Sequence, residues 1–217
     1  MLPGAWLLAV LTPIYNKFFL DDTINIDEKM EKIYLKNKWF LIPIYTYILA
    51  MFLTHIWSLM LFSGRFDGLP MFRVKVESMS EYIIFNAVLS FFGGASSLAG
   101  HELVHHKEWY NKVIGNLPYL QFFYTHFWDE HVKGHHKNVA TPEDAAFHDV
   151  GEDLYTSIVR SAVLTHVKTW EREQERLKDE KNPIVKLASN KMVHYFILHV
   201  TILVAIYNYF GTGGLWF

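Results

Sequence analysis

Length, composition and charge set the first limits on what this protein does. The chain has 217 residues, of which 17% are aromatic and 19% charged, and its formal net charge is -2. The near-neutral charge gives no electrostatic basis for nucleic-acid binding. The sequence has no cysteine, which excludes disulfides, thiolate nucleophiles, cysteine zinc sites and iron–sulfur ligation, so nitrogen and oxygen atoms must hold any metal.

Long uncharged runs of apolar residues indicate a membrane protein. A helix needs about 20 apolar residues to cross the hydrocarbon core of a bilayer. Three runs of sufficient length occupy residues 39–62, 82–100 and 192–210. A shorter first run is uncharged over residues 1–16 and continues past Lys17 to residue 20, because the amine of Lys17 can extend to the membrane interface. We therefore predict an all-α, multi-pass transmembrane helix bundle that forms a single membrane domain, residues 1–217. The segment 101–191 is predicted to be helical. It contains two histidine clusters, described below, which we call the histidine boxes.

Two further segments lie between the third and fourth runs. Residues 113–128 are uncharged, but Gly115 and Pro118 interrupt them, so we expect a segment that dips into the membrane or lies at its interface. Residues 154–181 carry apolar side chains at helical spacing and predict a helix that ends before an Asn-Pro pair. We expect its charge-rich end, residues 171–181, to be a solvated helix face.

Basic residues are distributed unevenly over the loops between the runs. Five lie from Lys17 to Lys38, three between the second and third runs, and twelve between the third and fourth. Basic residues favour cytosolic loops, so the first and third loops are predicted to be cytosolic. This orientation puts the histidine boxes on the cytosolic side of the membrane.

Two histidine clusters follow the third run: HELVHH begins at His101, and EHVKGHH begins at Glu130. In each cluster two histidines lie four residues apart and so share one face of a helix. Imidazole nitrogens are common ligands of transition metals. His106 would point about 100° away from its neighbour in a helix with 3.6 residues per turn, so it is not expected to be a ligand. His136 lies one step round from His135 but follows a pair on one face and can reach a neighbouring ion. We predict a metal site whose ligands are His101, His105, His131, His135 and His136.

Other residues near the clusters are candidates for orienting these ligands. A metal-bound imidazole usually donates its second N–H to a carboxylate or another acceptor. The candidates for this supporting role are Glu102, Glu130, His126 and Asp144. A capping or turn role is the alternative for Glu130 and Asp144.

Two other interpretations of the histidines stay open, and a third is disfavoured by the motif count. HELVH matches H-E-x-x-H, in which two histidines bind zinc and the glutamate is the general base of a metalloprotease. We rank this membrane zinc protease below a two-metal site, because it leaves the second cluster unexplained. Carboxylate-bridged di-iron bundles need two E-x-x-H motifs, and only one occurs near the clusters. A membrane protein that binds metal without turnover is the non-enzymatic alternative.

The same residues resemble a known family. HELVHH, followed by EHVKGHH and KNVATPEDAA, is similar to the boxes of the alkane hydroxylase (alkane 1-monooxygenase) family of integral-membrane, all-histidine di-iron enzymes. His106 stands where that family usually has Lys, and Ala145 where it usually has Pro. The VATPED extension separates the pattern from fatty-acid desaturases, which share only the general histidine-box scheme.

The resemblance implies a reaction, a cofactor and partners. The reaction is O₂-dependent hydroxylation of the terminal carbon of an alkane or similar fatty chain. The cofactor is a pair of iron ions, and the five candidate histidines are its ligands on this chain. A rubredoxin-type protein supplies the electrons, and the basic residues Lys133 and Lys137 are candidates for docking that acidic donor. Another membrane histidine-box hydroxylase or desaturase is the alternative within this type of enzyme.

Two further boxes of the alkane hydroxylases, an NYxEHYG-like box and a QRHxxHH-like box, do not occur in these 217 residues. In that family they supply the remaining metal ligands. We therefore expect the chain to be the N-terminal or middle portion of a longer enzyme. We also expect the isolated chain to be inactive.

Overall fold

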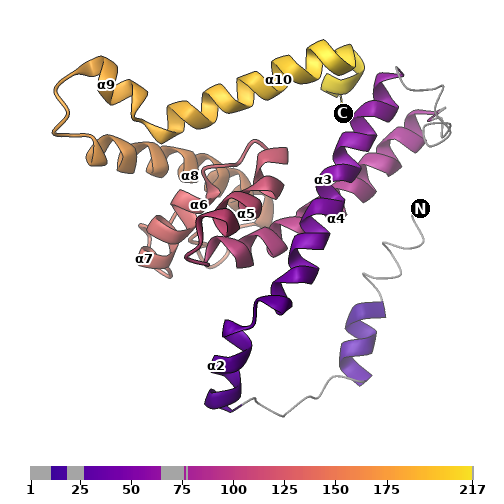
Figure 1. The fold of residues 1–217 in the computed structure, drawn as a ribbon, viewed down its shortest axis with the longest axis horizontal. Helices are drawn as coiled ribbons and strands as arrows, with labels where there is room; N and C mark the ends of the chain where they lie inside the picture. Colours follow the sequence, from indigo (N-terminus) through magenta and orange to yellow (C-terminus); the bar gives the residue numbers. More distant parts are fainter. Residues whose placement is uncertain (1–10, 19–26, 65–75, 77, 217) are drawn as a thin grey trace. The chain divides into compact units, whose positions relative to one another are not determined.

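A computed structural model of the chain describes residues 11–18, 27–64, 76 and 78–216 (Figure 1). These described residues form helices, turns and irregular segments, without a strand. They divide into two compact units, of which one comprises the described residues up to Ala99 together with 212–216 and the other residues 100–211. The predicted all-α class is therefore confirmed.

The first unit contains helices that begin and end at recognisable signals. Its elements are α2 (Glu28–Lys36), η1 (Lys38–Leu41), α3 (Ile42–Ser63) and the greater part of α4 (Met79–Val104). Asp27 begins α2, because its carboxylate accepts hydrogen bonds from the backbone N–H groups of Lys29 and Met30 at 2.8 Å. Gly64 ends α3 with a φ of 65°, a left-handed conformation that glycine adopts without a steric cost.

Helices α3 and α4 pack together through aromatic rings. The ring of Phe62 lies 5.2 Å from those of Tyr82 and Phe85, and the hydroxyl of Tyr47 donates to the carbonyl of Phe92 at 3.0 Å. The buried residues of α3 lie along one face and are Ile48, Met51, Ser58 and Leu61. The rest of its surface is largely apolar and exposed, which suits contact with lipid.

Three described helices are long and apolar enough to cross a membrane. They are Lys38–Ser63, Met79–Val104 and Lys191–Leu215. They contain the predicted second, third and fourth runs, which are thus confirmed as helices. Of the predicted first run, residues 11–18 form an exposed helix, and residues 1–10 and 19–20 lie outside the described residues. The chain is a helical membrane protein.

The second unit carries the histidine boxes. After the end of α4 its elements are α5 (Trp109–Gln121), α6 (Phe127–Glu130), η3 (His131–His135), α7 (His136–Asn138), α8 (Leu154–Arg176), α9 (Pro183–Ala188) and α10 (Lys191–Trp216) as far as Gly211. The short helix α6 packs against both α5 and α8 (Figure 1). This packing holds the second histidine box beside α8.

Helix α5 crosses the end of α4 at two glycines. A Cβ atom on Gly100 would lie 2.5 Å from the carbonyl oxygen of Gly115, and a Cβ on Gly115 would lie 2.8 Å from that of Gly100. The two backbones therefore approach as closely as they do only because both residues lack a side chain. The predicted interruption at Gly115 and Pro118 is wrong, because α5 continues through both residues. With 13 residues, α5 is nevertheless too short to span a bilayer.

Helix α8 turns its polar face toward the rest of the second unit. Asp153 caps it by accepting from the backbone N–H groups of Tyr155 and Thr156 at 3.0 Å. Its buried residues are Ser157, Thr165, Thr169 and Glu173. Its exposed apolar residues include Val159, Val163, Val167 and Trp170.

The charge-rich end of this helix differs from the prediction. Helix α8 ends at Arg176, and the side chain of Glu173 is buried rather than solvated. Glu173 accepts hydrogen bonds from the guanidinium of Arg176 at 2.7 Å and from the backbone N–H of Lys191 at 3.0 Å. The prediction of a wholly solvated face is wrong, because these donors satisfy a carboxylate that joins α8 to the start of α10.

Candidate metal centre

Four histidines from the two boxes converge on one point. His101 lies on α4 and His105 just after its last residue, while His131 opens η3 and His136 opens α7. One ring nitrogen of each lies within 4.8 Å of the other three. The structure therefore brings together four of the five predicted ligands.

The distances between these nitrogens suit a metal ion. The Nε2 atom of His131 lies 2.6 Å from that of His101, 3.2 Å from that of His105 and 3.0 Å from that of His136. A neutral imidazole carries one N–H, so Nε2 of His131 cannot form a hydrogen bond with all three neighbours. With metal–nitrogen bonds of about 2.1 Å, adjacent ligands at 90° would be about 3.0 Å apart and tetrahedral ones about 3.4 Å. The three short distances to His131 are thus in the range expected for nitrogens that share a transition-metal ion.

A π-helical turn decides which histidine of the second box joins this group. The backbone N–H of His136 donates to the carbonyl of His131, five residues earlier in the chain. The α-helical register that we predicted for this box is therefore wrong at this turn, and the wider turn brings His136 beside His131. Such turns are rare and occur frequently at functional sites.

His135 lies next to the group, but its ring is held by a different partner. Its ring stacks on that of His131 at a centroid distance of 5.3 Å. Its Nδ1 donates to the carboxylate of Asp144 at 2.8 Å, and that buried carboxylate also accepts from the backbone N–H of Ala146 at 2.9 Å. A proton on Nδ1 leaves the lone pair of Nε2 free, which is the tautomer that a metal ligand needs. Asp144 therefore lies where the sequence placed it, beside a candidate ligand.

The surroundings keep the imidazoles of His131 and His105 neutral. Burial, followed by the charges of the neighbouring histidines, lowers the pKa of His131 to about 3. Burial and the same neighbours also lower the pKa of His105. Phe127 stacks on His131 at 4.8 Å and on Tyr119 at 4.0 Å, which forms an apolar wall beside the nitrogens. Neutral imidazole is the form that binds a metal ion.

The remaining predicted neighbours of the ligands lie elsewhere. Glu102 is exposed, with Oε1 4.0 Å from Nε2 of His106. Glu130 binds Arg172 and Thr169 of α8, rather than a box histidine, among the contacts of the described residues. His126 is buried in a separate group, where its ring packs 3.7 Å from that of His166.

The two lysines proposed for donor docking have different surroundings. Lys133 forms an ion pair with Asp129, and its amine lies 4.8 Å from the centre of the Trp128 ring. The amines of Lys112 and Lys191 lie 5.1 and 5.2 Å from the same ring. Lys137 lies exposed on α7. A group of positive charges therefore surrounds one indole beside the second box.

Asp129 is a buried acid that the sequence analysis missed. Its carboxylate accepts hydrogen bonds from Lys133, from Lys191 at 3.1 Å and from the Tyr195 hydroxyl at 2.8 Å. Burial alone would raise the pKa of Asp129, but these hydrogen bonds and charges outweigh it and keep the pKa below its ordinary value. The sequence offered one signal for this contact: Lys133 follows Asp129 by four residues, the spacing at which opposite charges meet on a helix.

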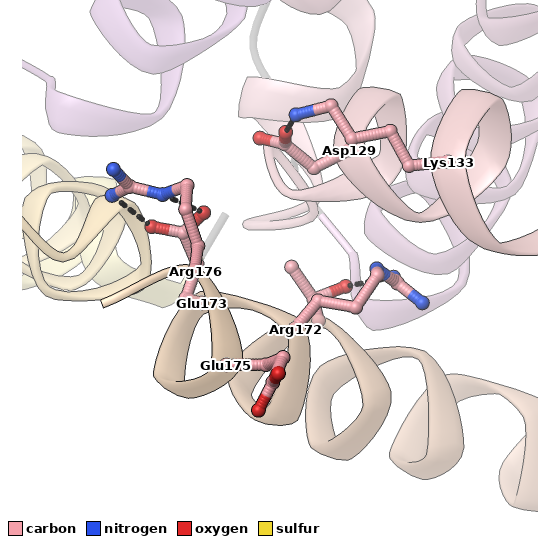
Figure 2. Close-up of a pocket in the computed structure, with 7 residues that line it drawn as sticks. Asp129, Lys133, Arg172, Glu173, Glu175 and Arg176 are labelled. Atoms are coloured by element: carbon pink, nitrogen blue, oxygen red, sulfur yellow. Dashed lines mark hydrogen bonds and ion pairs between the residues drawn. The ribbon is translucent and has the colours of Figure 1, made fainter. Parts of the chain in front are cut away.

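A polar cavity of about 290 Å³ lies between the second box and α8. Figure 2 shows Asp129 and Lys133 on one side of it and four charged side chains of α8 on the other, namely Arg172, Glu173, Glu175 and Arg176. An apolar chain would not replace the hydration of such a charged lining favourably. The cavity is therefore part of a polar seam that fixes the second box to α8, rather than a place for a hydrocarbon.

The fold and these histidines together define a helical membrane protein with a candidate metal centre. The fatty acid desaturase family matches residues 81–217, which is more than half of the chain. The chain belongs to this family. The match includes all five candidate ligands.

Several curated relatives have a more specific name. Alkane 1-monooxygenase 1 of Alcanivorax borkumensis is 33% identical over 131 residues, which are 60% of this chain and 32% of the relative. The alkane 1-monooxygenase of Pseudomonas putida is 31% identical over 140 residues, 64% of this chain and 35% of that protein. The enzyme of the same name from Acinetobacter baylyi is 24% identical over 177 residues, 82% of this chain and 41% of the relative.

These relatives confirm the resemblance that the boxes predicted. The matched part of the chain spans about a third of the length of the first two relatives. Within a family named for desaturases, the chain is thus similar to proteins named as alkane monooxygenases.

Proposed function

We propose that this protein contributes the first histidine boxes of an enzyme that hydroxylates the terminal carbon of an alkane or similar fatty chain with O₂. The observation that carries the proposal is the convergence of four histidine nitrogens within 4.8 Å in a helical membrane protein. The names of the relatives support the reaction class.

The proposed metal is iron, held first by the four converging histidines. Iron bound there would supply the one-electron chemistry that activates O₂ and oxidises a C–H bond. Burial lowers the pKa of His131 and so keeps its imidazole neutral, and Phe127, backed by Tyr119, covers one side of that ring. His135, with its tautomer set by Asp144, is proposed as a ligand of a second iron.

Five histidines are too few to complete two iron sites. We therefore propose that the isolated 217-residue chain binds iron weakly and does not hydroxylate alkanes. Adding a segment with the two further family boxes is expected to restore both properties. Two tightly bound irons and octanol formation by the isolated chain would contradict this.

A zinc protease fits the geometry less well. A catalytic zinc keeps three protein ligands and an open position for water. Here His131 and His136 join the two histidines of HELVH, and Glu102, the required base, is exposed beside His106.

Metal analysis and turnover test the proposal. The chain, extended by a segment with the two further family boxes and purified in detergent, should bind close to two irons and convert octane to octanol when an electron donor is supplied. Replacing His101, His131 or His136 by Ala should lower the iron content and abolish turnover. One zinc per chain together with peptide hydrolysis would overturn the proposal.

The histidine boxes are proposed to face the cytosol, because the flanking loops carry the most basic residues. The absence of native cysteine makes this easy to test with single cysteines at Gly68 and Asn138. The two should react with an impermeant thiol reagent from opposite sides of the membrane. Labelling of both from one side would contradict the proposed topology.

Docking of a rubredoxin-type donor is proposed at the basic surface of the second box. Lys137→Glu is the clean test, because Lys137 is exposed whereas Lys133 neutralises the buried Asp129. The variant should bind the acidic donor more weakly and with less dependence on salt. Unchanged affinity and salt dependence would refute docking at this surface.

A further inference from the structure

A buried ion pair between Glu130 and Arg172 lies next to η3, the π-helical turn that carries His131. Glu130, the residue before His131, has only 5% of its side chain exposed. Its Oε2 accepts a hydrogen bond from the guanidinium of Arg172 and another from Thr169 Oγ1 at 3.2 Å. Both partners lie on α8. A buried carboxylate needs such partners, because removing it from water without them is costly.

This ion pair occupies the place where Gly134 lacks a side chain. A Cβ atom on Gly134 would lie 2.6 Å from Nη1 of Arg172 and closer still to Oε1 of Glu130. Gly134 is buried and lies within η3. The guanidinium and the carboxylate therefore pack against the backbone of the π-helical turn itself, at the only residue of η3 that leaves room for them.

The turn needs a tertiary contact of this kind. A π-helical turn is rare and is ordinarily less favourable than the α-helical one. In the α register, His131 would align with His135, four residues on, instead of His136. The sequence Glu-His-Val-Lys-Gly-His-His thus offers two alternative partners for His131, and the register of one turn selects between them.

We propose that Arg172 is a positioning residue for the metal site. Its ion pair with Glu130, packed on Gly134, holds η3 in the π register and so selects His136 as the partner of His131. The role in selecting a ligand rests on the proposed metal site. The effect of the ion pair on the backbone of η3 does not depend on any metal.

The first test measures the backbone of the turn. Hydrogen exchange is followed by mass spectrometry on the chain in detergent micelles, without metal. Arg172→Gln removes the ion pair, and Gly134→Ala displaces it while it keeps every charge. Both should speed amide exchange over residues 130–138. Arg176→Gln removes the same charge one turn along α8, where it pairs with Glu173, and should leave that exchange unchanged. Unchanged exchange in both test variants would overturn the proposal.

The second test measures which histidine binds. Co²⁺ is titrated into the chain, and its visible absorption reports the ligands. In the parent chain His136→Ala should weaken Co²⁺ binding at least about tenfold, and His135→Ala only a few-fold. In the Arg172→Gln and Gly134→Ala backgrounds this order should be lost or reversed.

The two tests separate the two hypotheses. If Co²⁺ binding depends on none of the converging histidines, the proposed metal site fails, and the exchange experiment still decides the role of the ion pair. If Co²⁺ binding depends on His136 equally in all backgrounds, the positioning role of Arg172 fails and the metal site stands.

Discussion

The buried His126 is expected to make the free energy of unfolding of this protein depend on pH. Only 1% of its surface is exposed, and its ring packs 4.4 Å from that of Tyr124 and 3.7 Å from that of His166. Burial, followed by the charges of His166 and His199, lowers the pKa of His126 to about 3. The folded protein therefore holds this imidazole neutral at pH values where the unfolded chain protonates it.

The sign and size of the effect follow from this difference. A histidine in an unfolded chain has a pKa of about 6.5, so below that pH the unfolded state binds more protons than the folded state. The free energy of unfolding is then unaffected above about pH 6.5 and falls as the pH falls toward 3. Each pH unit below 6.5 costs roughly 1.4 kcal/mol, which gives about 2 kcal/mol between pH 7.5 and pH 5.

The variant His126→Phe isolates this contribution. A phenyl ring keeps the packing against Tyr124 and His166 but does not titrate, and the interaction that it removes, between Nε2 and Thr165 Oγ1, is long at 3.5 Å. Unfolding is followed in detergent micelles by the loss of helical circular dichroism at several pH values. The parent protein should lose about 2 kcal/mol more than the variant between pH 7.5 and pH 5. Equal losses would show that folding does not keep His126 neutral, and would refute the reasoning.

Three further predictions concern the packing and the site. Gly115→Ala should lower the free energy of unfolding by about 1–3 kcal/mol, because its Cβ would meet a backbone carbonyl, whereas Gly94→Ala has open space and should be neutral by the same unfolding assay. Asp129→Asn should cost about 3 kcal/mol, because it removes the charge that two lysines share; an unfolding midpoint equal to that of the parent would contradict this. His106→Ala should change the iron content less than about twofold and His105→Ala at least about tenfold, because only the latter converges with the other ligands; equal losses of iron would overturn the assignment of the first box.

The spanning helices could be predicted from the sequence because lipid imposes a length and a composition on them. A run of about 20 apolar residues has few alternatives to a helix in a bilayer. The first histidine box was also predictable, since His101 lies within a regular helix and His105 directly after it. Local spacing was sufficient in both cases.

The second box was harder because its geometry depends on a distant residue. Arg172, 42 residues after Glu130, contacts the turn from α8, and nothing in the spacing of the histidines indicates a π register. The sequence also could not predict which face of α8 is buried, because that too depends on distant residues. Its periodicity predicts a helix, but the polar residues at Thr165 and Thr169 are buried while Val163 is exposed. The side chains of the neighbouring helices determine which face of α8 packs against them.

The space at Gly134 also limits the order in which this chain can evolve. A mutation that adds a side chain there meets Glu130 and Arg172 while both are in place. A mutation that first removes Arg172 leaves a buried carboxylate without its cation, which is costly in itself. Each single step is harmful although the combined change need not be, so these three positions are expected to show strong epistasis. A random library of single substitutions would miss combinations of them that fold well.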